Sequence, residues 1–501
     1  MPGQSRMPVP VPVPVPVAGA AAEAVIAEAL IAEAEETVRA VLAREGRRVR
    51  RASRKARAAR RLLADRARRA ERAADRRRTE EQRRLARAEK ARRELAAHVR
   101  RLREASGGSI LECFRTVADP RDPRGVRYAL ASVLALVTAA MLAGCETLAD
   151  IIAWIRHAPR GDLEALGCRA APCGRTVTRI LALVSPRALS RAVGAWLARA
   201  GEKGPVTFPV AGPALLPQVT CDGKEVRGAR RPDGANLFLL SAALTGAARR
   251  AAAGAIVLAD REIPAKTNEI PQIGPMLLEL AAWFPLAGHV ITADALHTQR
   301  EFTETVCEKL LAHYVLTVKR NQKNLYKALD GLCWAGASRH ETRDKGHGRA
   351  ERRSHLVIDA PAEIRALFPH VRQVAKVIRT RTVTSWESDG SKRTRVTKTS
   401  TETVYLITSL TSREAAPEHI AAYIRSHWGI ENQVHWIRDA TLSEDSSKVR
   451  AGNRPASLAT LRNAQLGVIR QHGSNDIAAT RREARYDNDL LHALLRLEPA
   501  T

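Results

Sequence analysis

The chain has 501 residues, of which 45% are hydrophobic, so it can bury at least one large core. Its 82 Lys and Arg against 53 Asp and Glu give a formal net charge of +29. This balance favours a polyanionic partner, either nucleic acid or an anionic membrane surface, and disfavours a small-molecule metabolic enzyme. The seven cysteines are scattered and odd in number, which argues against a disulfide framework and indicates a reducing compartment.

The amino-terminal region has two unusual compositions in succession. Pro8–Val17 alternates Pro and Val, which predicts that residues 1–17 are a disordered tract rather than a signal peptide. Residues 18–105 are rich in Ala and Arg and predict a long helical extension, strongly basic over its second half, with few large apolar residues. Two interpretations stay open for this extension, namely contact with DNA phosphates and a solvated spacer.

Residues 106–200 predict a helical domain. The uncharged run Tyr128–Cys145 is just long enough to span a bilayer. It is, however, rich in Ala, Ser and Thr, and Glu146 and Asp150 follow at once. A buried helix is therefore favoured over a membrane span.

The periodicity changes after residue 205, and residues 205–450 predict an α/β domain with a mixed sheet flanked by helices. Strand-like runs lie at Pro217–Cys221, Leu237–Leu244, Ala255–Ala259, His289–Thr292 and Tyr314–Lys319, and helical runs at Gln299–Leu311 and Glu418–Ile437. Residues 339–410 are rich in Thr, Val and Arg and predict a strand-rich insertion. Residues 451–501 predict a C-terminal helical segment.

Three acidic residues occur where a hard-cation site would need them. Asp222 and Asp294 each follow an apolar strand-like run, and Glu431 lies in the helix after the strand-rich stretch. Taken singly, each is more typical of a turn or a surface. Together they suit phosphodiester cleavage. About three carboxylates can hold two Mg²⁺ ions, and these ions activate the nucleophile and stabilise the leaving oxygen.

Eight short motifs, in one order along the chain, carry a family resemblance. They are Leu111–Arg124, Cys221–Lys224, Lys266–Ile270, Thr292–Gln299, Tyr314–Gln322, Gly346–Arg349, His427–Asn432 and Glu444–Asp445. On these motifs the chain resembles bacterial insertion-sequence transposases with a DDE triad, in the H-repeat-associated (ISAs-one type) branch. The resemblance implies an RNase H-like catalytic core with a strand-rich insertion before the last acid.

The resemblance also implies the chemistry and its residues. Asp222 would be the first metal ligand, Asp294 the bridging second ligand and Glu431 the third, with Mg²⁺ as cofactor and Mn²⁺ able to substitute. The implied reaction is metal-dependent cleavage and strand transfer of double-stranded DNA at element ends and target. The active complex would be a homodimer or larger, in the cytoplasm and associated with the nucleoid.

The chain departs from the family pattern at several positions. Arg320 stands where the family usually has Gly. In a related branch, Tyr, Arg and Lys at fixed offsets around the Glu serve hairpin formation. Here Ile424, His427 and Arg438 occupy those offsets, so the resemblance does not support a hairpin intermediate.

Several side chains near the three acids are candidate DNA contacts. They are Lys224, Arg227, Lys319, Arg320, Asn321, Gln322, His427, Trp428 and Arg438. For each, a solvated or packed side chain is the alternative, and for Trp428 core packing is favoured over base stacking. The four-residue spacing of His427, Glu431, His435 and Asp439 also permits a zinc site, which is the less favoured interpretation.

Two other functions stay open alongside transposition. One is a catalytically inactive, transposase-derived protein that binds DNA, and the other is a metal-dependent RNase H-like nuclease without strand transfer. The first predicts salt-dependent binding without products. The second predicts nicks without joined strands.

Overall fold

The computed structural model describes residues 108–200, 215–230, 234, 236–246, 254–263, 269–346, 349–388 and 393–497. The chain divides into two compact units, Met1–Glu94 and Leu95–Thr501, and every described residue belongs to the second. The predictions for the Val-Pro tract and for the helical extension lie outside the described residues, as do Lys266, Thr267 and Asn268.

Helices make up the first described segment. They are α3 (Ile110–Arg115), α4 (Leu130–Leu142), α5 (Leu148–His157), α6 (Arg160–Ala165), α7 (Gly174–Leu183) and α8 (Pro186–Ala200). All residues of α4 are buried, so the apolar run forms the core helix that was predicted. In the described part of the chain no single helix is long and apolar enough to cross a membrane, although the bent pair Gly174–Leu183 and Pro186–Ala198 passes by length and composition.

A nine-stranded mixed sheet follows, in the order β3-β2-β1-β4-β5-β9-β8-β7-β6. Its first five strands are β1 (Gln218–Arg230), β2 (Asn236–Thr245), β3 (Ile256–Ile263), β4 (Val290–Ala293) and β5 (His313–Val318). Strands β1 to β3 form an antiparallel meander, whereas β4 runs parallel to both β1 and β5. Between strands lie α9 (Ile270–Ala281) and α10 (Arg300–Glu304), the latter followed by the π-helical turn Thr305–Lys309. The predicted mixed α/β sheet is confirmed.

Strand β1 is longer than the sequence predicts. It does not end at Cys221, because pairing with β2 continues to Val226↔Leu237. A glycine within a strand often marks a close approach of another group, and a Cβ on Gly223 would lie 2.3 Å from Oε1 of Glu269. Asp222 therefore lies inside a strand, one residue past the last parallel pair with β4, and its prediction as a strand-end residue is wrong.

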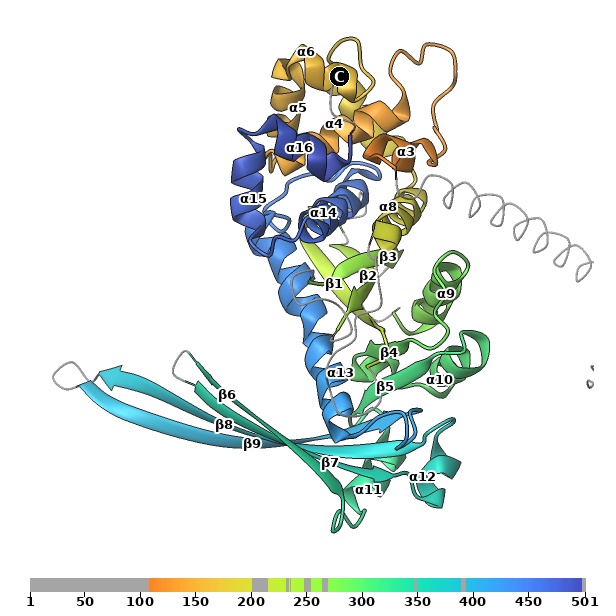
Figure 1. The fold of residues 1–501 in the computed structure, drawn as a ribbon, viewed down its shortest axis with the longest axis vertical. Coiled ribbons are helices and arrows are strands. Elements are labelled where there is room, and N and C mark those ends of the chain that lie inside the picture. The colour runs from red at the N-terminus through yellow and green to blue at the C-terminus, as the bar shows by residue number, and fades with distance from the viewer. Residues whose placement is uncertain are drawn as a thin grey trace, which may run out of the picture. The chain divides into compact units, whose positions relative to one another are not determined.

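The strand-rich insertion is confirmed and extends the same sheet. Its strands are β6 (Ser338–Gly346), β7 (Arg349–Asp359), β8 (Gln373–Ser388) and β9 (Arg393–Thr408), with α11 (Lys323–Asp330) before them and α12 (Ala362–Leu367) between β7 and β8. Strand β9 joins β5 through pairs such as Val315↔Thr408. In Figure 1 the far ends of these four strands project from the rest of the sheet as a long twisted arm.

The last described segment returns to the first helices. Helix α13 (Pro417–Ile430) runs into π-helical turns, and α14 (Arg454–Gln471), α15 (Ile477–Ala484) and α16 (Asn488–Leu495) follow. Helix α14 packs against α4, α7 and α8. The Gln465 side chain donates to the Met141 carbonyl oxygen at 2.5 Å, and the Ser457 hydroxyl donates to that of Leu181 at 3.1 Å. The two helical regions predicted separately thus form one packed group (Figure 1).

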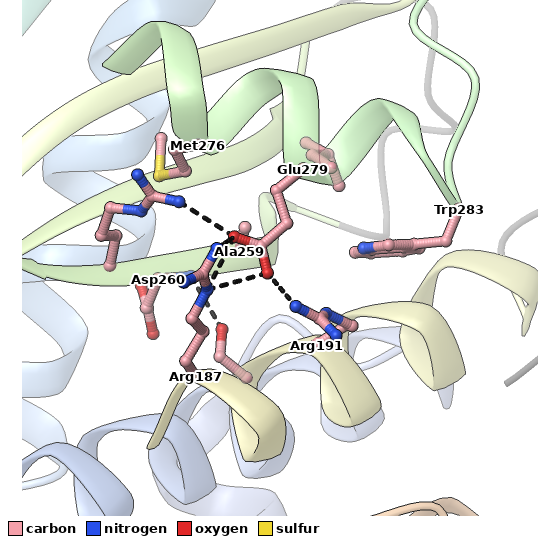
Figure 2. A pocket seen from close by; sticks show the side chains of 10 residues that line it. Arg187, Arg191, Ala259, Asp260, Met276, Glu279 and Trp283 are labelled. Carbon is pink, nitrogen blue, oxygen red and sulfur yellow. Dashed lines mark hydrogen bonds and ion pairs between the residues drawn. The ribbon is translucent and has the colours of Figure 1, made fainter. Parts of the chain in front are cut away.

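Glu279 of α9 joins the helical group to the sheet. Figure 2 shows Arg187 and Arg191 of α8 pointing at its carboxylate, and Arg261 of β3 donates to it at 2.9 Å. Burial would raise the pKa of Glu279, but the hydrogen bonds from Arg187 and Arg191 outweigh burial and lower that pKa to about 2. The ionised carboxylate therefore holds α8 against β3 and α9.

We expect Glu279→Gln to destabilise the protein at pH 7 by an amount that shrinks in acid. The folded pKa lies below the ordinary value of 4.5, so the stabilisation is complete above that value. It is lost as the pH falls through about 4.5 toward about 2. Urea unfolding at a series of pH values measures the difference, with Glu164→Gln in the exposed pair with Arg160 as control. A difference that does not change with pH would contradict this assignment.

Candidate active site

The structure carries the three predicted acids on neighbouring elements. Cys221 of β1 pairs with Ala293 of β4 in parallel register, so Asp222 and Asp294 each come directly after one of two paired residues on adjacent strands. Helix α13 packs against β1, β2 and β4. Glu431 follows α13 as the first residue of the π-helical turn Glu431–His435, a rare geometry that is frequent at functional sites.

The three carboxylates share one electrostatic environment. Burial raises the pKa of Glu431, the negative charges of Asp222 and Asp294 raise it further, and His435 opposes them. A cation relieves repulsion of this kind, and carboxylate oxygens are the ligands that hard divalent ions prefer. The donor set thus fits a divalent cation chemically. Among the residues that the structure describes, however, no three His, Cys, Asp or Glu side chains are already gathered to hold one.

The backbone fixes the position of Asp294. Its Oδ1 accepts a hydrogen bond from the backbone N–H of Leu296 at 3.0 Å and so caps the 3₁₀ turn Ala295–His297. The side chain is 50% exposed, so one face of the carboxylate stays accessible to a ligand. Asp294 follows β4 directly, as the sequence predicts.

The residues that follow β5, 319–322, have two different roles. The Asn321 side chain donates to the Ala295 carbonyl oxygen at 2.7 Å, and Gln322 donates to that of Thr298 at 2.8 Å. These two amides brace the loop that carries Asp294. Lys319 and Arg320 are exposed and, within the described chain, form no ion pair, so they keep their predicted availability to DNA.

His427 of α13 and His435 of the following π-helical turn lie close to residues of the sheet. Nδ1 of His435 lies 3.3 Å from Oδ2 of Asp222, and Nδ1 of His427 lies 3.3 Å from Oγ1 of Thr292. Burial lowers the pKa of His427, against the charges of Asp222 and Asp294, which raise it. His427 and His435 therefore pack beside the acids, and no described group of side chains supports the zinc interpretation.

Two predicted DNA contacts are wrong. Lys224 is 6% exposed, and its Nζ lies 2.5 Å from Oδ1 of Asp439. Arg438 is fully buried and donates to both carboxylate oxygens of Glu444, at 3.0 and 2.9 Å. Neither buried cation can reach a DNA phosphate, because each is already paired with an acid inside the protein. Arg227, in contrast, is 78% exposed and stays a predicted contact.

Trp428 links α13 to the insertion. The guanidinium carbons of Arg353 and Arg379 lie 5.5 and 5.1 Å from its ring centre, at cation–π distance. The side chain keeps 39% of its surface exposed. Packing thus accounts for part of Trp428, while base stacking stays a prediction for the exposed part.

Two buried residues beside the acids had no role in the sequence-based interpretation. Glu269 is 3% exposed, and its Oε2 lies 3.3 Å from Nε2 of His297. The same nitrogen lies 3.9 Å from Oδ1 of Asp294. Both residues lie in motifs that support the family resemblance, which was the available signal.

Two family models match the chain. The one described as DDE_Tnp_1-associated covers residues 111–197, and the one described as Transposase DDE domain covers residues 236–464. The second match contains Asp294 and Glu431 and begins after Asp222.

Curated relatives cover most of the chain as well. "Putative transposase YncI" of Escherichia coli O157:H7 is 26% identical over 382 residues, which are 72% of this chain and 87% of the relative. "H repeat-associated putative transposase YhhI" of Escherichia coli strain K12 is 25% identical over 376 residues, 72% of this chain and 90% of the relative. A solved piggyBac transposase synaptic complex with hairpin DNA aligns at 12% identity and a TM-score of 0.35, covering 78% of this chain and 80% of that one.

The two family matches account for the helical segment and for most of the sheet, including the insertion. The relatives extend the match over nearly their whole length. The chain therefore belongs to the DDE transposases, in the H repeat-associated branch, a family of divalent-metal-dependent enzymes that cleave DNA and join it by transesterification.

Proposed function

We propose that Asp222, Asp294 and Glu431 are the catalytic triad with which this transposase cuts the ends of an insertion sequence and joins them to target DNA. One observation carries the proposal: the register of β1 with β4 and the packing of α13 against both strands place the three carboxylates on neighbouring elements, where the first two raise the pKa of the third. Like charges gathered in this way favour a cation between them.

In this proposal Asp222, Asp294 and Glu431 would be the residues that hold Mg²⁺. When bound, Mg²⁺ supplies the charge that activates the attacking oxygen and stabilises the leaving one, and Mn²⁺ would substitute. The parallel pair β1 and β4 sets the spacing of the two aspartates, and the Leu296 amide orients Asp294. A rigid pair of strands is a precise support for such a site.

The chemical steps are two in-line displacements at phosphorus. In the first, a water oxygen bonds to phosphorus as the P–O3′ bond breaks, which leaves a 3′-hydroxyl at the element end. In the second, that hydroxyl attacks a target phosphate, and the broken P–O3′ bond releases a new 3′-hydroxyl. The carboxylates keep their positions through both steps, since catalysis here is positioning and charge stabilisation.

We further propose that the core is RNase H-like, which is supported by the order β3-β2-β1-β4-β5, with an antiparallel meander of β1 to β3 and the parallel strands β1, β4 and β5. The proposed domains are residues 106–200, 205–450 with the insertion at about 339–410, and 451–501. The partners would be double-stranded DNA and a second copy of the chain, because two element ends must be paired. The enzyme would act in the cytoplasm at the nucleoid.

An assay of product classes tests the proposal. The full chain is incubated with Mg²⁺ or Mn²⁺ and DNA that carries the gene's own flanking sequences, beside Asp294→Ala. Joined strands that the variant does not form are the expected result. Triad-dependent nicks without joining would indicate a nuclease, and binding without either product would indicate an inactive DNA-binding protein.

Lys319 and Arg320 are exposed cations that directly precede Asn321 and Gln322, the residues that brace the loop of Asp294. If each contacts a phosphate, its replacement by alanine should reduce the slope of log affinity against log salt by about 1. Filter binding at several salt concentrations measures the slope, with Arg160→Ala, an exposed arginine of α6, as control. An unchanged slope in both variants would exclude these phosphate contacts.

A further inference from the structure

A buried carboxylate lies against the strand that carries Asp222. Side chains alternate between the two faces of a strand, so a side chain on Gly223 would point away from that of Asp222. The space that it would occupy is filled by the carboxylate of Glu269, with Oε1 at 2.3 Å from the Cβ position. Glu269 therefore lies behind the site, at the start of α9, and is 3% exposed.

His297 connects this carboxylate to Asp294. The ring is 1% exposed, and its Nε2 lies 3.3 Å from Oε2 of Glu269 and 3.9 Å from Oδ1 of Asp294. Its Nδ1 is buried and has no hydrogen-bond partner in the described part of the chain. A hydrogen on Nε2 thus faces two carboxylates, while Phe302 packs beside the ring, 6.2 Å between centres.

We propose that Glu269 and His297 are a positioning pair for the catalytic site, an inference that rests on the proposed triad. Glu269 accepts the Nε2–H of His297, and the His297 ring in turn lies against the Asp294 carboxylate, with Nε2 3.9 Å from Oδ1. The pair connects the backbone of β1 at Gly223 to the turn after β4, so it sets the separation of the two aspartates. Partners behind a metal-holding residue commonly change metal affinity by about 10- to 100-fold when removed.

The test measures the binding of Mn²⁺ to the full chain without DNA, with electron paramagnetic resonance as the readout. Glu269→Ala and His297→Ala should each weaken binding by about tenfold or more. Glu269→Gln should recover most of the affinity, because its amide oxygen still accepts the hydrogen bond from His297. If Glu269→Gln binds as weakly as Glu269→Ala, the charge of Glu269 acts directly and the positioning role is overturned.

A matched control separates positioning from loss of stability. His492 and Asp162 form another largely buried pair, with Nε2 and Oδ1 3.0 Å apart, in the helical group. His492→Ala should lower the thermal midpoint in EDTA as His297→Ala does, yet leave Mn²⁺ affinity unchanged. Equal loss of Mn²⁺ affinity in both variants would overturn the proposal.

Asp294→Ala distinguishes failure of this inference from failure of the triad. If Asp294→Ala abolishes tight Mn²⁺ binding while His297→Ala and Glu269→Ala bind as wild type, only the positioning pair is overturned. If Asp294→Ala itself binds Mn²⁺ as wild type, the proposed triad falls, and the pair with it.

Discussion

Glu431→Gln is expected to lower DNA cleavage by about a thousandfold while DNA affinity stays close to that of wild type. Glutamine keeps the size of the side chain and removes the charge that Asp222 and Asp294 oppose. The neutral amide of the variant attracts a divalent cation far less strongly than the Glu431 carboxylate. Asp222→Asn and Asp294→Asn should give losses of the same order, because the three groups act on the same phosphate.

The measurement is single-turnover cleavage of end DNA in saturating Mg²⁺ and Mn²⁺, with band-shift affinity measured in parallel. Glu301→Gln is the matched control, because Glu301 is an exposed acid in the first turn of α10 and takes no part in the site. Wild-type cleavage by Glu431→Gln would remove Glu431 from the triad. If the variant loses both DNA affinity and cleavage, misfolding is indicated instead, and thermal unfolding checks for it.

Glu444→Ala is expected to lower the free energy of unfolding by about 3–5 kcal/mol. Glu444 is 0% exposed and accepts from Arg438, and Nη1 of Arg462 lies 3.4 Å from its Oε1. Burial would raise the pKa of Glu444, but the charges of Arg438, Arg462 and Lys224 outweigh burial and lower it to about 2. Removal of this carboxylate leaves those cations buried without their shared counter-charge.

Urea unfolding at pH 7 measures the effect of Glu444→Ala, and Glu164→Ala is the control. Glu164 pairs with Arg160 on the surface of α6, where solvent screens the interaction, so no measurable change is expected. A loss as small as that of the control would show that the buried cluster does not stabilise the fold.

The same cluster ties the elements of the site together. Lys224 belongs to β1, Arg438 to the π-helical turn Ile437–Thr441 beyond Glu431, and Arg462 to α14. Glu444 contacts all three. Glu444→Ala should therefore also reduce cleavage at temperatures where the protein is still folded, because the helix that carries Glu431 loses an anchor to β1.

Local signals predicted part of the site well. Asp294 follows an apolar run and does lie directly after β4, and the apolar run at Tyr128–Cys145 does contain a core helix. Asp222 was misjudged because Asp-Gly resembles a turn. The strand continues through Gly223 because its pairing with β2 continues, and Glu269, from a later segment, occupies the space beside this glycine.

Charge was the least reliable local signal. Lys224 and Arg438 are basic residues in a strongly basic chain, which predicts exposure and DNA contact. Their acidic partners Asp439 and Glu444 bury them instead. The partners of Lys224, Asp439 and Glu444, lie far later in the sequence, so no local sequence pattern predicts the pairing.

The sequence by itself determined the family, the mixed α/β class and the strand-rich insertion and supplied the three acids as candidates, because strand periodicity and short motifs are local properties. Only the tertiary structure decided that the insertion extends the central sheet through β9 and β5, and that α14 packs among the first helices. It alone brought Glu269 and His297 behind Asp294. These arrangements depend on pairing and burial between distant segments, whose free energy no local stretch of sequence encodes.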